Sequence, residues 1–405
     1  MNDERWLLPA GIDEVLPPQA TELESLRRAL LDLYMSWGYE LVIPPFIDYL
    51  DSLLTGTGRD LDLQTFKLTD QLSGRLLGVR ADMTPQVARI DAHQLRREAP
   101  TRLCYLGTVL HTRGDGFAGT RSPLQIGAEI YGHDGPESDV EILRLVVQTL
   151  ETAGIASPYL DLGHVGVYRG LAQQARLSRA DEMRLFEALQ RKARSEIAEL
   201  IADAGIGGAV GDMLLALPDL NGDDALARAG TALRGAGAPV LAALDRLRRV
   251  ADELQRWLPT QPVHFDLAEL RGYTYKTGMV FAAFVPGWGL EIARGGRYDD
   301  IGSVFGRARP AVGFSTDLKG LIALAEPSKA GIADEGAVLA PWDADPGLSA
   351  EIARLRAAGR RVIQELPGQP GDIGELGCTA CLERRGSGWA LRPLAADAGD
   401  DQARA

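Results

Sequence analysis

Apolar residues between positions 20 and 37 recur at spacings of three and four, the period of a helix with one buried face. They are Leu23, Leu26, Leu30, Leu33 and Trp37. Pro17 and Pro18 precede this segment and Gly38 follows it, where prolines and glycines commonly flank helices. We predict a helix over 20–37. A strand over Tyr39–Pro45 follows and ends at two prolines, which have no N–H to donate to a sheet.

Two apolar segments, 102–110 and 122–131, predict a pair of strands. The residues between them, 111–121, are rich in glycine and polar side chains, which is typical of a long turn. Such a strand–loop–strand unit is of a kind that folds over a ligand. Further strand patterns occur at 263–268, 279–284 and 289–294.

Residues 170–256 have a different character, because they are rich in Ala, Leu and Arg and show few strand patterns. Leu185, Leu189 and Ile197 are among the apolar positions of a helical pattern. We therefore predict a helical insertion, at about 170–256, within a core of residues 1–325.

The chain beyond about residue 328 is rich in Ala, Gly, Pro and Asp. Its pattern predicts a strand in GAVLAPW, a helix over 347–358 and a strand in RRVIQEL, the minimum for a small α/β domain. We place this domain at 328–395. The acidic tail at 396–405 is expected to be disordered.

Composition narrows the class of protein. The 405 residues are 45% hydrophobic and 24% charged, which is ordinary for a globular protein. The net charge of -13 argues against general nucleic-acid binding, which depends on Lys and Arg. The start of the chain lacks the basic and apolar regions of a signal peptide, and no run of about 18 apolar residues predicts a membrane helix. We expect a cytoplasmic protein.

Cysteine and histidine positions give no pattern of a metal site. The three cysteines are a sparse, odd set, which is typical of a reducing compartment. Cys378 and Cys381 form a single C-x-x-C, without the second pair or the histidines that a zinc site requires. The five histidines show no metal spacing either. We expect neither a metal nor a cofactor.

The segment 270–281 places Arg271, Tyr273 and Tyr275 at alternate positions. In a strand these side chains share a face, where a guanidinium and two phenols suit a small ligand with a carboxylate. Without further information, a solvated arginine beside half-buried tyrosines is the commoner explanation of such a pattern.

Two further pairs of polar residues could bind a small amine. Asp82 and Thr84 suit an ammonium group, although both residue types are ordinary helix N-caps. Gln125 and Glu129 share a face of the second predicted strand, where an amide and a carboxylate could bind an imidazole or an amine, although exposed polar residues are also common on strands. The glycine pair in ARGGRYDD (293–300) is compatible with a close backbone approach to a ligand or with a tight turn.

Taken in order, these pieces resemble the class II aminoacyl-tRNA synthetase core, and specifically histidyl-tRNA synthetase. The resemblance runs from about residue 7 to 325. Its strongest elements are PAGIDEVLPP, VRADMTPQVAR, the LGTVL…QIGAEIYG hairpin, RGYTYKTG and GGRYDD…FG…PAVGFS. It implies an α+β fold, with a six-stranded antiparallel sheet flanked by helices. It also implies a homodimer formed through the first helix and strand.

The resemblance assigns most of the polar residues above to a histidine pocket. Tyr273 is not among them, and the second tyrosine of the family's Tyr-Tyr pair is Lys276 here. The positions that match the family's histidine-binding residues are Asp82, Thr84, Gln125, Glu129, Arg271, Tyr275 and Tyr298.

The departures lie where synthetases bind ATP. The arginine for the α-phosphate falls on His111, and the arginine for the γ-phosphate falls on Gly320, next to Lys319. Guanidinium groups bind phosphate through two hydrogen bonds and stay charged, whereas histidine is mostly neutral at pH 7. Arg113 or Arg121 could replace only the first arginine. We therefore expect no catalytic residues and no aminoacylation.

The C-terminal segment is shorter than the family's anticodon-binding domain and offers no basic face, so we expect no tRNA binding. A core of this kind resembles the regulatory subunits of ATP phosphoribosyltransferase, which belong to histidine biosynthesis. The resemblance implies the short-form catalytic subunit as partner in a hetero-octamer, with histidine as allosteric ligand. The alternatives are a histidyl-tRNA synthetase and a synthetase-like RNA-sensing module.

Overall fold

A computed structural model describes residues 6–54, 59–114, 120–325, 336–368 and 376–394. The chain divides into two compact units, Met1–Pro327 and Ser328–Ala405, which are described separately. The centre of the predicted long turn, 115–119, and the predicted disordered tail lie outside the described residues. Among the described helices, none is both long and apolar enough to cross a membrane.

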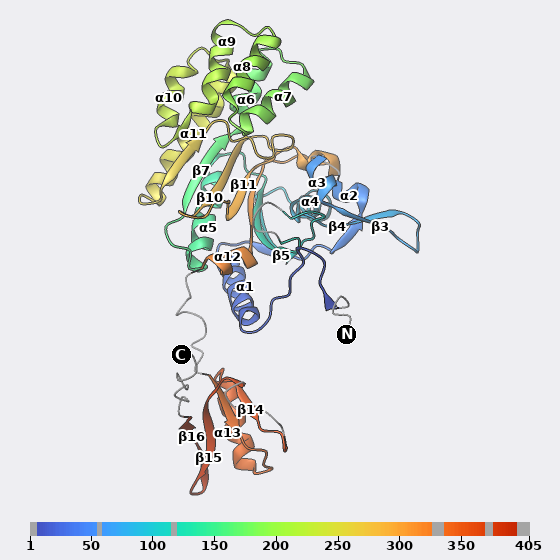
Figure 1. Ribbon diagram of the computed structural model, residues 1–405, viewed down its shortest axis with the longest axis vertical. Coiled ribbons are helices and arrows are strands. Elements are labelled where there is room, and N and C mark those ends of the chain that lie inside the picture. Colours follow the sequence, from blue (N-terminus) through green and yellow to red (C-terminus); the bar gives the residue numbers. More distant parts are fainter. Residues whose placement is uncertain (1–5, 55–58, 115–119, 326–335, 369–375, 395–405) are drawn as a thin grey trace, which may run out of the picture. The chain divides into compact units, whose positions relative to one another are not determined.

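The first unit is built on a nine-stranded mixed sheet (Figure 1). Its six central strands are antiparallel, as predicted. Three short strands extend it at its edges: β1 and β9 fall within the predicted strands 39–45 and 263–268, whereas β8 was not predicted. The order is β1 (Glu40–Val42), β5 (Thr101–Thr108), β6 (Leu124–Tyr131), β12 (Ala311–Asp317), β11 (Ala293–Arg297), β10 (Met279–Phe284), β7 (Tyr159–His164), β9 (Val263–Asp266) and β8 (Asn221–Gly222).

One face of this sheet is covered by α1 (Gln19–Ser36), α5 (Pro136–Thr152) and α12 (Leu318–Leu324). Alternate residues of β6 point toward these helices and are fully buried among apolar side chains, because successive residues of a strand point to opposite faces. The helix predicted over 20–37 is confirmed as α1. Its Leu30 and Tyr34 are fully buried, and Tyr34 lies edge-on to Phe314 of β12 with ring centroids 6.0 Å apart.

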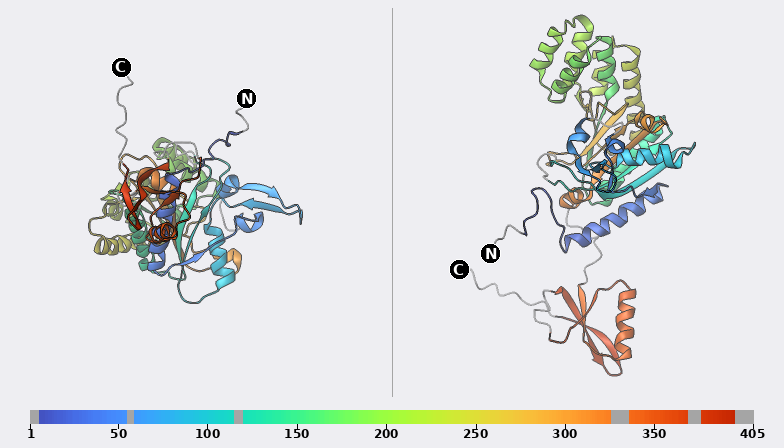
Figure 2. Two further views of the ribbon diagram at one scale, coloured as in Figure 1. Left: turned by 90° about the horizontal axis from the view of Figure 1, so that it is seen from below. Right: turned by 90° about the vertical axis from the view of Figure 1, so that its right-hand side faces the viewer.

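The opposite face of the sheet, called the open face below, faces the N-terminal part of the unit. Here α4 (Thr84–Arg89) and the π-helix Ile90–Leu95 lie near a small sheet of β2 (Ile47–Tyr49), β4 (Leu76–Val79) and β3 (Phe66–Thr69). Two short helices, α2 (Leu50–Leu54) and α3 (Arg59–Gln64), complete this region. The β3–β4 hairpin projects sideways from the core as an arm (Figures 1 and 2).

The helical insertion forms a lobe at one end of the sheet (Figures 1 and 2). Its last helix, α11, packs against α6, α5 and β7 and so joins the lobe to the core. The predicted apolar positions Leu185, Leu189 and Ile197 are buried. The helices are α6 (Val165–Gln174), α7 (Arg179–Gln190), α8 (Arg194–Asp203), α9 (Gly208–Ala216), α10 (Ala225–Ala232) and α11 (Ala238–Trp257).

The second unit contains the predicted strand, helix and strand as β13 (Ala337–Ala340), α13 (Pro346–Ala357) and β14 (Val362–Gln364). The pattern missed the antiparallel pair β15 (Cys378–Arg385) and β16 (Gly388–Pro393), which completes a four-stranded sheet. Val338, Leu348 and Leu382 are in its buried core. Both cysteines of the C-x-x-C are free thiols on β15.

Two predicted strands are wrong. The segment 289–294 is strand only from Ala293, because Pro286 and Gly287, at φ +84°, turn the chain after β10. The part of 270–281 before Met279 consists of turns, with Gly272 at φ +71°. The alternate-face argument for Arg271, Tyr273 and Tyr275 therefore fails.

Candidate functional site

Five of the seven predicted histidine-binding residues meet on the open face of the sheet. Asp82 and Thr84 lie at the start of α4, and Tyr298 follows β11. Gln125 and Glu129 are four residues apart on β6, so their side chains lie on the same face. They are joined by hydrogen bonds among themselves and to Tyr105 of β5.

Asp82 connects the start of α4 to the sheet. Its Oδ1 accepts hydrogen bonds from the backbone N–H of Thr84 at 3.0 Å and from Gln125 Nε2 at 2.9 Å. Gln125 Oε1 in turn accepts from the backbone N–H of Met83 at 3.0 Å. The N-cap residue of α4 is Met83, without a side-chain cap, so neither Asp82 nor Thr84 has the alternative N-cap role. Asp82 belongs instead to a hydrogen-bonded polar cluster.

Glu129 is the most buried charged residue of the site, with 1% of its surface exposed. Its Oε1 accepts hydrogen bonds from the hydroxyls of Tyr105 at 2.9 Å and Thr84 at 3.3 Å, and its Oε2 accepts from Tyr298. Burial raises the pKa of Glu129 to about 8, although the tyrosine hydrogen bonds oppose this shift. The site therefore holds a carboxyl group that changes its charge near neutral pH.

Glycines form the floor beneath this carboxyl group. A Cβ on Gly313, which pairs with Glu129 across the β6–β12 ladder, would overlap the carboxylate. Gly296 pairs with Gly313 on the next strand, and a Cβ there would lie 2.8 Å from Lys276 Nζ. The predicted glycine pair therefore lies in β11, and neither a loop nor a tight turn forms there.

Lys276 is buried at the same site. Its Nζ donates to the carbonyl oxygen of Gly295. Because paired Cβ positions are about 5 Å apart, the glycine positions place the ammonium within roughly 10 Å of the Glu129 carboxylate, on the same face of the sheet. Burial lowers the pKa of Lys276 to about 7, assisted by Arg294 and opposed by Glu129. The sequence identified this position only as a departure from the family's tyrosine pair.

Arg271 and Tyr275, the other two predicted residues, lie in the turns between β9 and β10. Arg271 forms ion pairs with Glu269 and Glu291 and is held at the edge of the site. Tyr275 is 37% exposed. Tyr273, from the same segment, points into the insertion, where it donates to Glu182 and stacks on Phe186 at 5.2 Å between ring centroids.

A cavity of about 350 Å³ adjoins the cluster. Asp82 and Gln125 line it, whereas Glu129, Lys276 and Tyr298 are buried behind them and do not. Apolar walls come from Ala81, Val109, Trp288, Leu290, Ile292 and Leu324. The end of the predicted pocket at Asp82 and Gln125, where an amino group is expected, is thus accessible. The end at Glu129 and Tyr298, where an imidazole ring is expected, is closed by protein atoms.

The two positions that match the ATP arginines line this same cavity. His111 is 7% exposed, and its Nε2 lies 2.9 Å from the carbonyl oxygen of Ala81. Gly320 leaves room, since the nearest atom to a Cβ built there is an Asp317 carboxylate oxygen at 3.8 Å. Arg121 donates to the carbonyls of His111 and Ala10, and Lys319 pairs with Asp13 at 3.0 Å. Neither cation lines the cavity.

Sequence reasoning missed Tyr105, Tyr131 and Glu291 as members or neighbours of the site. Tyr105 pairs with Gly127 across the β5–β6 ladder, and a Cβ on Gly127 would meet its hydroxyl at 2.5 Å. The alternation of β5 places Tyr105 on one face, but only the register with β6 shows that this face is the open one.

The comparisons with known proteins agree with this geometry. Residues 11–321 match the family model of histidyl-tRNA synthetase, and residues 335–392 match that of the ATP phosphoribosyltransferase subunit HisZ C-terminal domain. A solved structure titled as an ATP phosphoribosyltransferase regulatory subunit/histidyl-tRNA synthetase from Bacillus halodurans has a TM-score of 0.80 at 24% identity, covering 91% of this chain and 95% of that one. Histidyl-tRNA synthetase from Nostoc has a TM-score of 0.72 at 18% identity, over 96% and 94%. These two likenesses show the fold alone.

The fold and the family model over residues 11–321 therefore define a class II synthetase-like protein of the histidyl-tRNA synthetase type. Sequence relatives are more specific. An ATP phosphoribosyltransferase regulatory subunit from Alkalilimnicola ehrlichii is 61% identical over 97% of this chain and 98% of the relative. One from Thioalkalivibrio sulfidiphilus is 60% identical over 95% and 97%. The chain belongs to the family of ATP phosphoribosyltransferase regulatory subunits.

Proposed function

We propose that this chain activates the short-form catalytic subunit of ATP phosphoribosyltransferase by assembling with it and transmits feedback inhibition by histidine. The observation that carries the proposal is the 61% identity, along nearly the whole chain, to a protein named as the regulatory subunit. The match of 335–392 to the HisZ C-terminal domain supports it at the end of the chain that departs from synthetases. The three free cysteines fit a reducing, cytoplasmic location.

The cavity chemistry supports a role without ATP activation. Adenylate formation requires fixed positive charge around the phosphates. At the first arginine position the cavity is lined by His111, whose Nε2 faces a backbone carbonyl. At the second position it is lined by Gly320, which has no side chain. Three acidic groups, Asp82, Glu291 and Asp317, also line it. They outnumber the one arginine among the described lining residues, Arg294, which pairs with Glu291 at 3.3 Å, so the lining would repel a triphosphate.

The decisive experiment measures phosphoribosyltransferase activity of the catalytic subunit with and without this chain, across a histidine titration. We expect a large activation that histidine reverses. No change in activity on mixing would refute the regulatory role. Histidine-dependent exchange between ATP and pyrophosphate would then test for a histidyl-tRNA synthetase, and tRNA binding at low salt would test for an RNA-sensing module.

We propose that histidine binds at the cluster on the open face. Its amino group would meet Asp82, Thr84 and Gln125 at the accessible end, and its ring would extend toward Glu129 and Tyr298. Glu129 and Tyr298 do not line the cavity beside Asp82, so the ring reaches them only when buried side chains of the site move, and we expect Lys276 to be one of these. Arg271 and Tyr275 would close over the ligand from the segment that follows β9.

Calorimetric titration of the isolated chain with histidine tests this location. Gln125→Met removes the amide that bonds Asp82 and Met83 while keeping its length, so we expect affinity to fall at least about tenfold. Gln255→Met is the matched control, because Gln255 lies on α11 and bonds only the Pro259 carbonyl. Equal affinities in the two variants would place histidine elsewhere, such as at the subunit interface.

We propose that two copies associate through the N-terminal part of the core and that dimers of each chain form a hetero-octamer. Several large apolar side chains of this region are exposed in the single chain: Leu41, Ile43, Phe46, Ile47, Leu68, Leu72 and Leu76. Native mass spectrometry of the chain, alone and mixed with the catalytic subunit, gives the stoichiometry directly. A monomeric chain at micromolar concentration would contradict the homodimer.

A further inference from the structure

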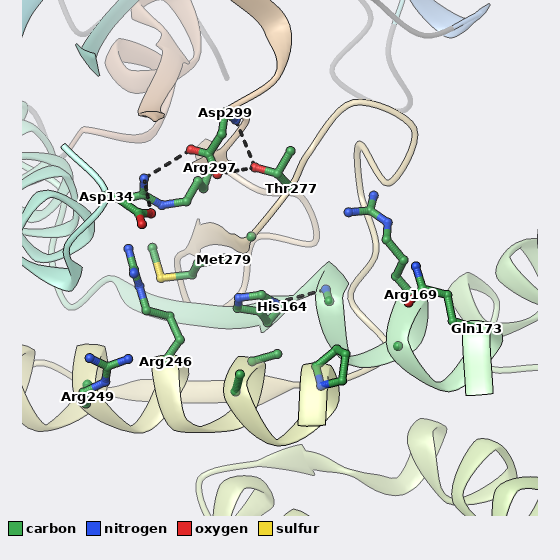
Figure 3. Close-up of a pocket in the computed structure, with 16 residues that line it drawn as sticks. Asp134, His164, Arg169, Gln173, Arg246, Arg249, Thr277, Met279, Arg297 and Asp299 are labelled. Atoms are coloured by element: carbon green, nitrogen blue, oxygen red, sulfur yellow. Dashed lines mark hydrogen bonds and ion pairs between the residues drawn. The ribbon is translucent and has the colours of Figure 1, made fainter. Parts of the chain in front are cut away.

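A second pocket, of about 430 Å³, lies where the helical insertion joins the core (Figure 3). Its walls come from α6, from α11 and from the segments that flank β10 and β11. It shares no lining residue with the cavity beside Asp82. Its polar and charged lining side chains are Arg169, His164, Arg246, Arg249, Arg297, Gln173, Asp134 and Asp299.

The inner wall carries more positive than negative charge. Arg246 and Arg297 both pair with the fully buried Asp139, at 2.8 and 2.7 Å, so one carboxylate serves two guanidinium groups. Arg297 also pairs with Asp299 at 3.2 Å. Arg169 forms no ion pair among the described residues and donates instead to two backbone carbonyls. Three guanidinium groups therefore face two carboxylates.

His164 adds a neutral donor to the same wall. Its Nδ1 accepts a hydrogen bond from the backbone N–H of Gly166 at 3.0 Å, so the proton of the neutral ring is on Nε2. Burial lowers the pKa of His164 to about 3, and Arg246, Arg169 and Arg297 contribute in that order. The ring stays neutral at physiological pH and can donate one hydrogen bond to an anion.

The rim is more exposed and mixed in charge. Arg249 is exposed and pairs with Asp245 at 3.1 Å, one turn earlier on α11. Asp134 is also exposed and lies 3.9 Å from Arg297. Gln173 and Arg169 stand on α6 across the pocket from Arg249 (Figure 3). Pro239, Ala242, Ala243 and Met279 supply apolar surface between these groups.

We propose that this pocket binds a small organic phosphate, with the phosphate held between the guanidinium groups of Arg169, Arg246 and Arg249 and the organic part against the apolar surface. Guanidinium groups are preferred partners of phosphate because they offer two parallel hydrogen bonds. The volume lies within the usual range of about 300–1,000 Å³ for small-molecule pockets, far more than a single phosphate ion fills.

The position of Arg169 links this pocket to the candidate histidine site. Its NH2 donates to the carbonyl oxygens of Tyr273 at 3.0 Å and of Lys276 at 2.9 Å. The segment between these two residues carries Tyr275. A phosphate that draws Arg169 into the pocket would change the support of this segment, so the pocket is suited to a second effector.

The test titrates the full-length chain with ribose 5-phosphate by calorimetry at low ionic strength, with inorganic phosphate and citrate as comparisons. We expect ribose 5-phosphate to bind, more tightly than inorganic phosphate. Arg249→Gln should weaken binding by about fivefold to tenfold, since it removes one partly exposed ionic contact. Arg248→Gln is the matched control, because Arg248 is exposed on the same helix and does not line the pocket.

Each other outcome overturns the proposal. No binding of ribose 5-phosphate would remove the site, and equal effects of the two arginine variants would show non-specific attraction. Tighter binding of inorganic phosphate or of citrate would contradict the assigned ligand class. Weaker binding in Gln125→Met, with no effect of Arg249→Gln, would place the phosphate in the cavity beside Asp82, which Gln125 lines. The titration measures ribose 5-phosphate binding in the absence of histidine, so its result does not depend on whether histidine binds this chain.

Discussion

Replacing Lys276 by methionine should make the free energy of unfolding respond differently to pH. The side chain is 7% exposed, and burial lowers its pKa from 10.5 to about 7. The folded wild-type chain thus disfavours the ammonium that the unfolded chain carries. Its stability is highest above pH 10.5 and is lost as the pH falls toward 7. Methionine has a similar length and no charge, so the variant lacks this loss.

The magnitude follows from the pKa shift. Between the two pKa values each pH unit changes the unfolding free energy by about 1.4 kcal/mol, and this slope falls to half at the folded pKa of about 7. The change from pH 9 to pH 7 is therefore about 2 kcal/mol in favour of Lys276→Met. Loss of the hydrogen bond to Gly295 costs about 1 kcal/mol at both pH values. Loss of the nearby cation raises the pKa of Glu129 further, which acts in the same direction.

Urea denaturation at pH 7 and pH 9, followed by tryptophan fluorescence, measures this difference. Lys67→Met is the matched control, because the Lys67 side chain is 44% exposed and pairs with Asp62 at the surface. Its stability relative to wild type should be the same at both pH values. A Lys276→Met difference that is constant with pH, or larger at pH 9, would refute the burial of a titrating ammonium beside Glu129.

Three further changes test the site and its support. The free energy of unfolding of Glu129→Gln should rise by about 2 kcal/mol relative to wild type between pH 6 and pH 8, because a carboxyl group with its pKa raised to about 8 makes the wild type less stable as the pH rises. The same denaturation series measures this difference, and a relative gain on lowering the pH would contradict it. Arg309→Met should cost about 3–5 kcal/mol in urea denaturation, since it leaves the buried Asp91 carboxylate without its 2.9 Å partner; a cost below about 1 kcal/mol would argue against the pair. Gly313→Ala should abolish calorimetric histidine binding by displacing Glu129, and unchanged affinity would separate histidine from this carboxyl group.

Helices and strands with a regular period were predictable because local periodicity records which side chains are buried. The helix α1, the β5–β6 hairpin and the apolar positions of the insertion follow this rule. The segment 270–278 does not follow this rule, because the alternation of Arg271, Tyr273 and Tyr275 also fits a turn in which Gly272 adopts a left-handed conformation. Alternation over a few residues does not distinguish the two.

The sequence by itself determined the fold family, and it predicted five of the residues that meet on the open face as well as a histidine and a glycine at the positions expected for the ATP arginines, since these are properties of residue type and order. Only the tertiary structure decided which of those residues meet. Glu129 lies far along the chain from Gly296 and Gly313, and the register of the ladders brings the three together. The contact of Lys276 with Gly296 then places the ammonium near the carboxyl group. The arginine pocket has the same origin, because Arg169, Arg246 and Arg297 converge only when the insertion packs against the core. Burial and electrostatic coupling depend on distances through space, which the order of residues along a chain does not specify.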